Sequence, residues 1–285
     1  MVAGGWQQVL PVFLLSILLS ASLSAALALL ILLVFRPPRV STMALNMATR
    51  PWSMSHVTLL TATVMCGIAA VPLLLQVAQR LGLEYWQVPP YTWLLAGAVF
   101  THIPCLAMIR VVMHFEHISF EYGFGITRGW QARRLATGVF LSLSTLPALA
   151  VVMILYQWVL TLLGAQYAPQ SVAVIIKDTA IEPWYVQAAA GILAVTLIPA
   201  VEELVFRGIV LPAAVKRIGF LPGVLLVSLV FAVIHVEIAT YAPLFVLSVA
   251  LCLAYAYSNS IIVPIAMHAT HNLIQVALLP FVSLQ

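Results

Sequence analysis

Two adjacent glutamates and an arginine interrupt a long apolar run in the last third of the chain. The segment from Gly191 to Gly219 reads GILAVTLIPAVEELVFRGIVLPAAVKRIG and contains Glu202, Glu203 and Arg207. A charged side chain inside a membrane helix costs roughly 2.5–3.5 kcal/mol on insertion scales, so it needs a functional or structural reason. Two adjacent carboxylates in such a run are hard to explain as packing.

Helical spacing gives these side chains different roles. Glu203 and Arg207 are four residues apart, so they can form an ion pair on one face of a helix and hold the structure. Glu202 lies about 100° further around the helix, where it can face a cavity and transfer protons. Pro199, three residues before Glu202, is expected to bend the helix and release backbone groups.

Two further apolar runs carry histidines at helical spacing. Phe231 and His235 lie four residues apart in LVFAVIHVEIA, and so do His268 and Asn272 in PIAMHATHNLIQ, which also contains His271. A single histidine in a membrane helix is most often a hydrogen bond between helices. Together with two glutamates these residues favour a shared polar site, in which His271 is expected to be a supporting residue or a helix–helix hydrogen bond.

The distances of these residues from the predicted turns place them at similar depths. Glu202 precedes the turn after its own run by 17 residues, and His235 follows the same turn by 16. His268 and Asn272 follow the turn between the last two apolar runs by nine and 13 residues. At 1.5 Å per residue these positions fall within about 5–12 Å of the Glu202 level. A common buried pocket is therefore expected.

The composition is that of an all-α, polytopic integral membrane protein with about eight transmembrane helices. Of 285 residues, 64% are hydrophobic and 7% are charged, against about 25% charged in soluble domains. The apolar runs cover residues 9–35, 56–79, 92–112, 136–164, 186–213, 221–236, 242–257 and 261–281. The first is too long for a signal-peptide core and is expected to be retained as a helix. The sixth and seventh are the shortest, which indicates a packed interior or a thinned bilayer around them.

Basic residues divide unevenly between the gaps separating these runs. Ten of the 12 Lys and Arg residues lie in 36–55, 110–135 and 207–220, and only Arg80 and Lys177 lie in the other gaps. The positive-inside rule places the first three gaps in the cytoplasm and both termini outside. The net charge of +4 is therefore interpreted as a topology signal and not as a nucleic-acid surface. The cysteines are expected to be small packing residues; they are Cys66, Cys105 and Cys252.

The chain divides into two parts of different character. Residues 1–135 hold three apolar runs and the segment 114–134, whose aromatic, glycine and charged residues are typical of a cytoplasmic membrane interface. Residues 136–285 hold the other five runs, with a polar core within 186–281. The first four runs are interpreted as lipid-facing helices without chemistry. The last four are expected to enclose the polar site and to open it toward the cytoplasm.

The three polar motifs together resemble a known family of membrane proteases. EExxxR at Glu202–Arg207, FxxxH at Phe231–His235 and HxxxN at His268–Asn272 follow the order found in the CPBP family. This family, also called ABI, comprises CAAX prenyl proteases such as CAAX prenyl protease 2 and bacteriocin-processing or immunity proteins. The resemblance covers residues 186–281. It implies hydrolysis of a peptide bond within the membrane, in a membrane-associated substrate such as a prenylated CAAX chain or another peptide.

The resemblance also implies a role for each motif residue. Glu202 would activate the attacking water as general base, and His235 would hold and polarise that water. His268 and Asn272 would stabilise the oxyanion of the tetrahedral intermediate. The residues that would support the site are Glu203, Arg207 and Phe231.

Metal dependence is the open point in this mechanism. Glu202, His235 and His268 would be the ligands of a zinc ion, because three protein ligands and a water make a catalytic zinc site. The chain has no HExxH motif, however. We therefore favour a glutamate-type mechanism that uses no metal or other cofactor.

Two other functions stay open on the sequence alone. A catalytically inactive scaffold or a bacteriocin-immunity protein would keep the fold, but it would not need a general base. A small proton-coupled transporter would also use glutamates and histidines inside the membrane. The chain shows no inverted repeat or matched pair of broken helices, which such transporters often have. The protease is favoured, with the bilayer and a membrane-associated peptide or protein as partners and no nucleic acid.

Overall fold

All described secondary structure in the chain is helical. The computed structural model describes residues 5–82, 90–129, 131–165 and 184–278. In chain order the first helices are α1 (Gly5–Phe35), α2 (Val40–Ala48), α3 (Met54–Arg80), α4 (Pro90–Phe115), α5 (Phe120–Phe124) and α6 (Gln131–Leu162). The later elements are α8 (Trp184–Ile192), η3 (Leu193–Leu197), α9 (Ile198–Glu203), η4 (Leu204–Val210), α10 (Leu211–Ile218), α11 (Phe220–Val233), η5 (Ile238–Thr240), α12 (Tyr241–Ser258) and α13 (Ile262–Leu278).

The lengths of the apolar helices confirm the prediction of an all-α polytopic membrane protein. Within the described residues, six helical segments are long and apolar enough to cross a membrane, and two shorter apolar helices, α11 and α13, accompany them. The six segments are Val12–Phe35, Met54–Arg80, Ala96–Phe115, Gln131–Leu162, Trp184–Ile218 and Ile238–Ser258. A chain of this kind is an integral membrane protein.

One prediction about helix length is wrong. The sixth apolar run is short as expected, because α11 has 14 residues. The seventh is not, because Ile238–Ser258 spans 21 residues, and the second short helix is instead α13, with 17. A hydropathy pattern counts apolar residues only. Here the helical structure continues through polar residues at both ends, Thr240 and Ser258, and is longer than the apolar run.

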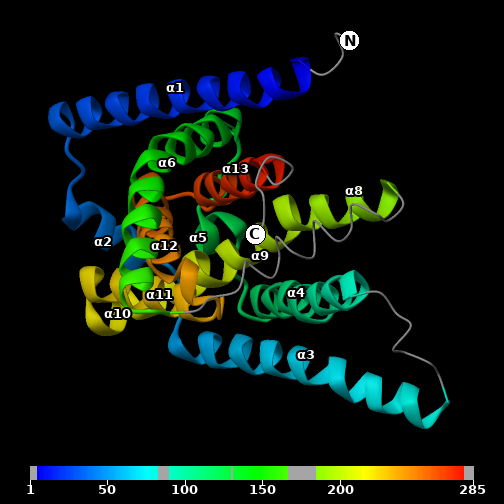
Figure 1. Ribbon diagram of the computed structural model, residues 1–285. Coiled ribbons are helices and arrows are strands. Elements are labelled where there is room, and N and C mark those ends of the chain that lie inside the picture. Colours follow the sequence, from blue (N-terminus) through cyan, green and yellow to red (C-terminus); the bar gives the residue numbers. More distant parts are fainter. Residues whose placement is uncertain (1–4, 83–89, 130, 166–183, 279–285) are drawn as a thin grey trace.

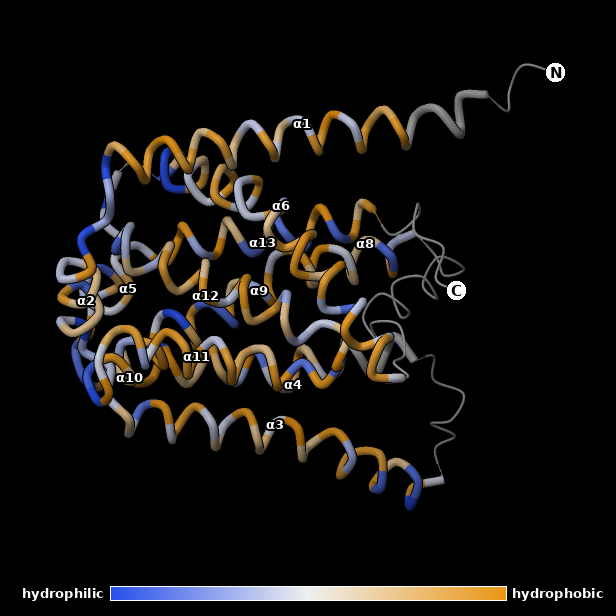
Figure 2. Tube along the Cα trace, turned by 60° about the vertical axis from the view of Figure 1, so that its left-hand side comes forward, coloured by the Kyte–Doolittle hydropathy of each residue, from blue (hydrophilic) through white to orange (hydrophobic). Residues whose placement is uncertain are grey.

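The last helices lie between two outer pairs. Figure 1 shows α1 with α6 on one side of α9, α12 and α13, and α3 with α4 on the other. Figure 2 shows the same order from a second direction. Helix α13 packs extensively against α6, and α11 against α12. The polar motifs therefore lie in the interior of the bundle, where other helices can cover them.

The segment Trp184–Ile218 is a continuous helix with two wide turns. The π-helical segments η3 and η4 interrupt it, and each is closely followed by a proline, Pro199 or Pro212. At the end of η3 the Ile198 N–H donates to the Leu193 carbonyl, five residues back instead of four. Such π-bulges often mark functional sites. The expected break at Pro199 thus takes the form of a wider helical turn.

Arg50 joins three loops at the polar end of the bundle. Arg50 is 6% exposed, and its guanidinium donates to the carbonyls of Glu121, Tyr122 and Asn259, each at 2.9 Å. Lys216 in turn donates to the Arg50 carbonyl. The three basic gaps of the sequence therefore meet at one end of the molecule, the hydrophilic end in Figure 2. Arg50 had been interpreted only as a topology signal, and its role as a clamp was missed.

The N-terminal helices are not purely lipid-facing at this end. Met47 of α2 and Trp52 are both fully buried in the main hydrophobic core, together with Phe124 of α5. The Trp52 indole donates to the Gly123 carbonyl at 2.8 Å. These residues lie outside the four apolar runs interpreted as lipid-facing. Inside those runs, Leu60 of α3, Ile109 of α4 and Leu149 of α6 are buried in the hydrophobic clusters. The interpretation that the runs only face lipid is therefore wrong at these positions. Hydropathy alone cannot distinguish an apolar surface that faces lipid from one that faces protein.

Gly125 lets the chain after α5 approach the loop that precedes α13. It has a φ of 73°, and a Cβ at this position would lie 1.8 Å from the Asn259 carbonyl oxygen. Next to it, the Ile261 N–H donates to the Phe124 carbonyl at 3.0 Å. Only glycine satisfies both the left-handed backbone and the close approach. Gly129 also has a positive φ, of 86°, but a Cβ there would meet nothing within 4 Å.

Replacing Gly125 by alanine should therefore destabilise the fold more than the same change at Gly129. Both variants place an L-residue in the left-handed region, at roughly 1–2 kcal/mol, but only Gly125→Ala adds a clash with Asn259. Thermal unfolding of the purified full chain in detergent measures both. Equal midpoints for Gly125→Ala and Gly129→Ala would contradict a structural role for the contact.

Candidate active site

The predicted site residues come from four neighbouring elements. Two of the motifs lie on regular helices, since Glu202 and Glu203 belong to α9 and His268 and Asn272 to α13. The other residues are Arg207 in η4, Phe231 in α11 and His235 in the turn that follows α11. Helix α13 packs against α9 and η3, and α11 packs against η4. The elements that carry the motifs are therefore in mutual contact.

Glu203 and Arg207 form the predicted ion pair, and both are completely buried. The Arg207 Nη1 donates to Glu203 Oε1 at 2.8 Å, and neither side chain is exposed. The other guanidinium nitrogen donates to the Ser248 hydroxyl of α12 at 2.6 Å. The guanidinium carbon lies 4.3 Å from the centre of the Phe231 ring, a cation–π contact. The charge of Arg207 is thus compensated on one side and covered by an aromatic ring on another.

His268 connects the two glutamates. Its Nδ1 lies 2.8 Å from Glu203 Oε1, and its Nε2 lies 3.8 Å from Glu202 Oε2. A carboxylate only accepts, so Nδ1 carries a proton in this contact, and Nε2 is the ring nitrogen that faces Glu202. The sequence did not predict the Glu203–His268 bond, because helical spacing shows only partners on the same helix and these residues are 65 positions apart.

Glu202 differs from its neighbour in exposure. The Glu202 side chain is 22% exposed, whereas that of Glu203 is 0% exposed. This division agrees with the roles expected from the helical angle between them. At 3.8 Å, Glu202 Oε2 and His268 Nε2 are too far apart for a direct hydrogen bond and close enough to contact one water or substrate atom together. The arrangement can therefore exchange a proton between a carboxylate, an imidazole and a bound molecule.

His235 lies outside a regular helix, beside a strained residue. Its Nδ1 is 2.7 Å from the Phe231 carbonyl, so Nδ1–H donates and Nε2 keeps a lone pair. The next residue, Val236, is in the left-handed region with a φ of 64° and is 78% exposed. A β-branched residue rarely adopts this conformation, and such strain tends to occur at functional sites. No sequence pattern indicated it.

Phe231 is the central packing residue of the site. It is 0% exposed, and its ring centre lies 4.7 Å from that of His235 and 6.0 Å from that of His268. Phe206 meets it edge to face at 5.2 Å. The phenylalanine of the FxxxH motif thus separates the two histidines and supports the guanidinium of Arg207. A smaller side chain there would remove the surface against which all three rest.

Asn272 satisfies a backbone group that Pro199 leaves unpaired. The Asn272 amide nitrogen donates to the Ala194 carbonyl of η3 at 2.9 Å. In an α-helix this carbonyl would accept from Ile198, but the Ile198 N–H donates to Leu193. In a π-helix it would accept from residue 199, which is proline and has no N–H. One amide hydrogen of Asn272 is therefore used for structure, and the other is left for a ligand.

The segment that carries these residues matches a known protein family. Residues 184–274 match the family model described as type II CAAX prenyl endopeptidase, Rce1-like. The matched stretch begins with α8 and ends within α13, so it includes all seven motif residues. Residues 184–274 are similar to this family, and we refer to the matched segment as the Rce1-like domain. The resemblance to the CAAX protease family is thereby confirmed, and the match supports a membrane protease. Searches of the curated proteins and of the solved structures found no match to the chain.

The Rce1-like domain does not place a set of metal ligands together. Among the residues that the structure describes, no group of three or more His, Cys, Asp or Glu side chains is arranged to hold a metal ion. Glu202, His235 and His268, the zinc ligands considered from the sequence, form no such group in this arrangement. We therefore derive the chemistry of the domain from its own side chains.

The Ala194 carbonyl allows a test of the Asn272 contact by a double-mutant cycle. Asn272→Ala leaves that buried carbonyl unpaired, which should lower the free energy of unfolding by about 1–3 kcal/mol. In a Pro199→Ala background the new N–H at position 199 can reach Ala194, so Asn272→Ala should be less destabilising there. Thermal unfolding of the four proteins gives the coupling. Equal effects in both backgrounds would contradict this account.

Proposed function

We propose that this chain is an intramembrane endopeptidase that hydrolyses a peptide bond of a membrane-associated substrate, with water activated by Glu202 and His235. The observation that carries the proposal is the position of His268 between two carboxylates, 2.8 Å from buried Glu203 and 3.8 Å from accessible Glu202. This arrangement lies inside a domain whose family is that of a CAAX prenyl endopeptidase. Peptide hydrolysis needs a base for water and donors for an oxyanion, and the site contains both.

The first step is attack of water on the scissile carbonyl carbon. Glu202 is the accessible carboxylate, and it takes a proton as the water oxygen bonds to that carbon. In this proposal His235 is neutral, and because its Nδ1–H donates to the Phe231 carbonyl, its lone pair lies on Nε2. This lone pair accepts a hydrogen bond from the same water and holds it for attack. The carbonyl π electrons move to oxygen, which becomes the oxyanion of a tetrahedral intermediate.

The second step is stabilisation and collapse of this intermediate. The remaining amide hydrogen of Asn272 and a protonated Nε2 of His268 donate to the oxyanion. In this proposal His268 is an imidazolium throughout the step: its Nδ1–H donates to Glu203 at 2.8 Å, and its Nε2–H donates to the oxyanion and keeps its proton. Collapse breaks the carbon–nitrogen bond, and the proton on Glu202 passes to the leaving amine. The products are a carboxylic acid and an amine, as hydrolysis requires.

The substrate class follows from the family and from the depth of the site. The matched family is described as a type II CAAX prenyl endopeptidase, and Glu202, Glu203 and Arg207 lie in a helix that is long and apolar enough to cross a membrane. We propose a peptide that a prenyl or similar lipid group holds at the membrane. We further propose that the polar end around Arg50 faces the cytoplasm, since ten of 12 basic residues belong to gaps on that side.

Removing the base or the water-holding histidine should abolish cleavage. Glu202→Gln and His235→Ala should each lower kcat by about 10²–10⁴-fold, as expected for loss of general base catalysis. Cleavage of lipid-anchored fluorogenic peptides in proteoliposomes measures this. Glu116→Gln is the matched control, because Glu116 pairs with His56 away from the site. Full activity in both site variants would refute the mechanism, and a cellular phenotype that survives Glu202→Gln without cleavage would identify a scaffold.

Cleavage should also persist after exhaustive chelation. Because a carboxylate and histidines supply the base and the donors, dialysis against a zinc chelator should change kcat by less than twofold. Metal analysis of the dialysed protein provides the control that zinc has been removed. Loss of activity that added zinc restores, with no change in unfolding temperature, would establish a metalloprotease instead.

A further inference from the structure

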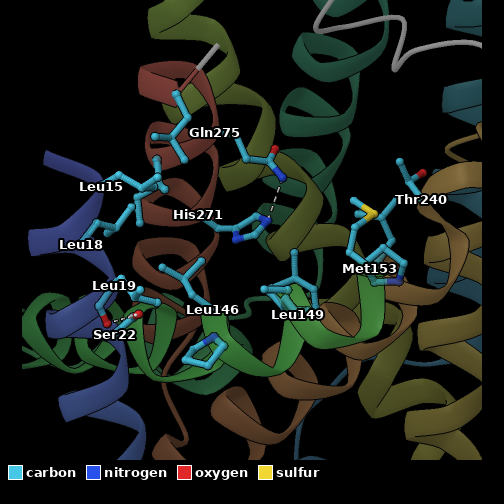
Figure 3. A pocket seen from close by; sticks show the side chains of 17 residues that line it. Leu15, Leu18, Leu19, Ser22, Leu146, Leu149, Met153, Thr240, His271 and Gln275 are labelled. Atoms are coloured by element: carbon cyan, nitrogen blue, oxygen red, sulfur yellow. Dashed lines mark hydrogen bonds between the residues drawn. The ribbon is translucent and has the colours of Figure 1, made fainter. Parts of the chain in front are cut away.

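A cavity of about 320 Å³ lies on the side of α13 that faces α1, α6 and α12. Most of its wall is apolar, and Figure 3 shows leucines of α1 and of α6 directed into it. Its polar members are Ser22, Thr240, His271 and Gln275. The volume is in the range of small-molecule sites. None of the residues assigned to peptide hydrolysis lines this cavity.

His271 presents an unpaired hydrogen-bond donor to this cavity. The side chain is 9% exposed, and its Nε2 lies 3.0 Å from the amide nitrogen of Gln275. That nitrogen only donates, so His271 Nε2 accepts and Nδ1 carries the proton. Nδ1 is buried and has no hydrogen-bonding partner in the described part of the chain. Figure 3 places the ring among the lining side chains. A buried donor of this kind requires an acceptor oxygen.

The other polar members do not supply that acceptor. The Ser22 hydroxyl donates to the Leu19 carbonyl at 2.9 Å, and the Thr240 hydroxyl donates to the Glu237 carbonyl at 2.9 Å. Each hydroxyl therefore donates to a carbonyl three residues earlier in its own segment. A helix–helix hydrogen bond, expected for His271 from the sequence, is not what the structure shows, since its partner Gln275 is on the same helix. A ligand in the cavity can supply the acceptor that Nδ1 lacks.

The position of the cavity in the bundle identifies the kind of ligand. Along α13 its lining runs from His271 to Leu278, the end of the helix away from the Arg50 clamp. Leu15 and Leu19 of α1 line the cavity and are still 54% and 55% exposed, so it borders the surface that faces lipid. At 1.5 Å per residue His271 is about 10 Å from Leu278, the last described residue of α13.

We propose that this cavity binds one acyl chain of an ester-linked bilayer lipid, with the ester carbonyl accepting the hydrogen bond from His271 Nδ1. The hydrocarbon chain packs against the leucine-rich wall. A cluster of water molecules in the same place would find few polar partners. The ester carbonyl supplies the missing acceptor for His271 Nδ1. The site is separate from the catalytic cluster and does not depend on the proposed function. His268, one turn earlier on α13, is directed to Glu203 instead.

Filling the cavity should remove the lipid. The full chain is purified in detergent, incubated with ester-linked phosphatidylcholine and examined by native mass spectrometry. The wild type should retain one lipid, and Ala150→Trp, which places an indole on the cavity wall, should retain none. Val151→Trp is the matched control, because Val151 is the next residue, is 55% exposed and does not line the cavity. Equal lipid retention by wild type and Ala150→Trp would overturn the proposal.

Ether-linked phosphatidylcholine tests the hydrogen bond itself, because it has the same chains without the carbonyl. The wild type should retain the ester lipid about three- to tenfold better than the ether lipid, the effect of one hydrogen bond. His271→Phe should bind both lipids equally, provided that its unfolding temperature matches that of the wild type. Equal retention of both lipids by the wild type would overturn the proposal. Displacement of phosphatidylcholine by a prenylated peptide would overturn it also, since the pocket would then belong to the substrate.

Discussion

The structure of the site depends on one buried carboxylate oxygen. Oε1 of Glu203 accepts hydrogen bonds from Arg207 and from His268, both at 2.8 Å, and the Glu203 side chain is 0% exposed. An unpaired charge at this position would be strongly unfavourable, since breaking a buried pair costs about 3–5 kcal/mol. Arg207 in turn is placed by Ser248 and Phe231. Four elements, α9 with η4, α11, α12 and α13, therefore have to meet at the same point before His268 can face Glu202.

A second constraint comes from the backbone of the long helix that carries the glutamates. Two π-helical segments and two prolines make it irregular where it faces the other helices. Irregular backbone inside a membrane is tolerated only where protein groups satisfy it. Asn272 does so for the Ala194 carbonyl, and it does so from the helix that also carries His268. The HxxxN motif thus has a structural function, because the Asn272 amide joins α13 to η3, and its second amide hydrogen is the donor that we propose for the oxyanion.

Sequence patterns predicted the local parts of this arrangement and missed the long-range parts. The Glu203–Arg207 pair and the contact of Phe231 with His235 follow from spacing on one helix, so they could be foreseen. The membrane fold followed from composition. The bond between Glu203 and His268 and the clamp formed by Arg50 join residues 65 and 209 positions apart. Such contacts depend on how the helices pack against one another. The periodicity of a single segment gives no information about that packing. The length of α12 was missed for a related reason, because helical structure extends beyond the apolar run.

His235 differs from the other site residues in how it is held. Glu202 and His268 lie within helices whose partners fix them, whereas His235 follows the end of α11, next to Val236 in a strained left-handed conformation. Val236 is 78% exposed, so its own side chain does not stabilise that conformation. Its backbone is held on both sides, because the Val236 N–H donates to the Val233 carbonyl at 3.2 Å and the Tyr241 hydroxyl donates to the Val236 carbonyl at 3.2 Å. Next to it, the Nδ1–H of His235 donates to the Phe231 carbonyl, and the His235 ring packs on the same residue. The strained residue thus adjoins the one residue proposed to hold the attacking water. Because the turn and the helices are joined through Phe231, the orientation of His235 is coupled to that of Arg207, and through Glu203 to the imidazole of His268.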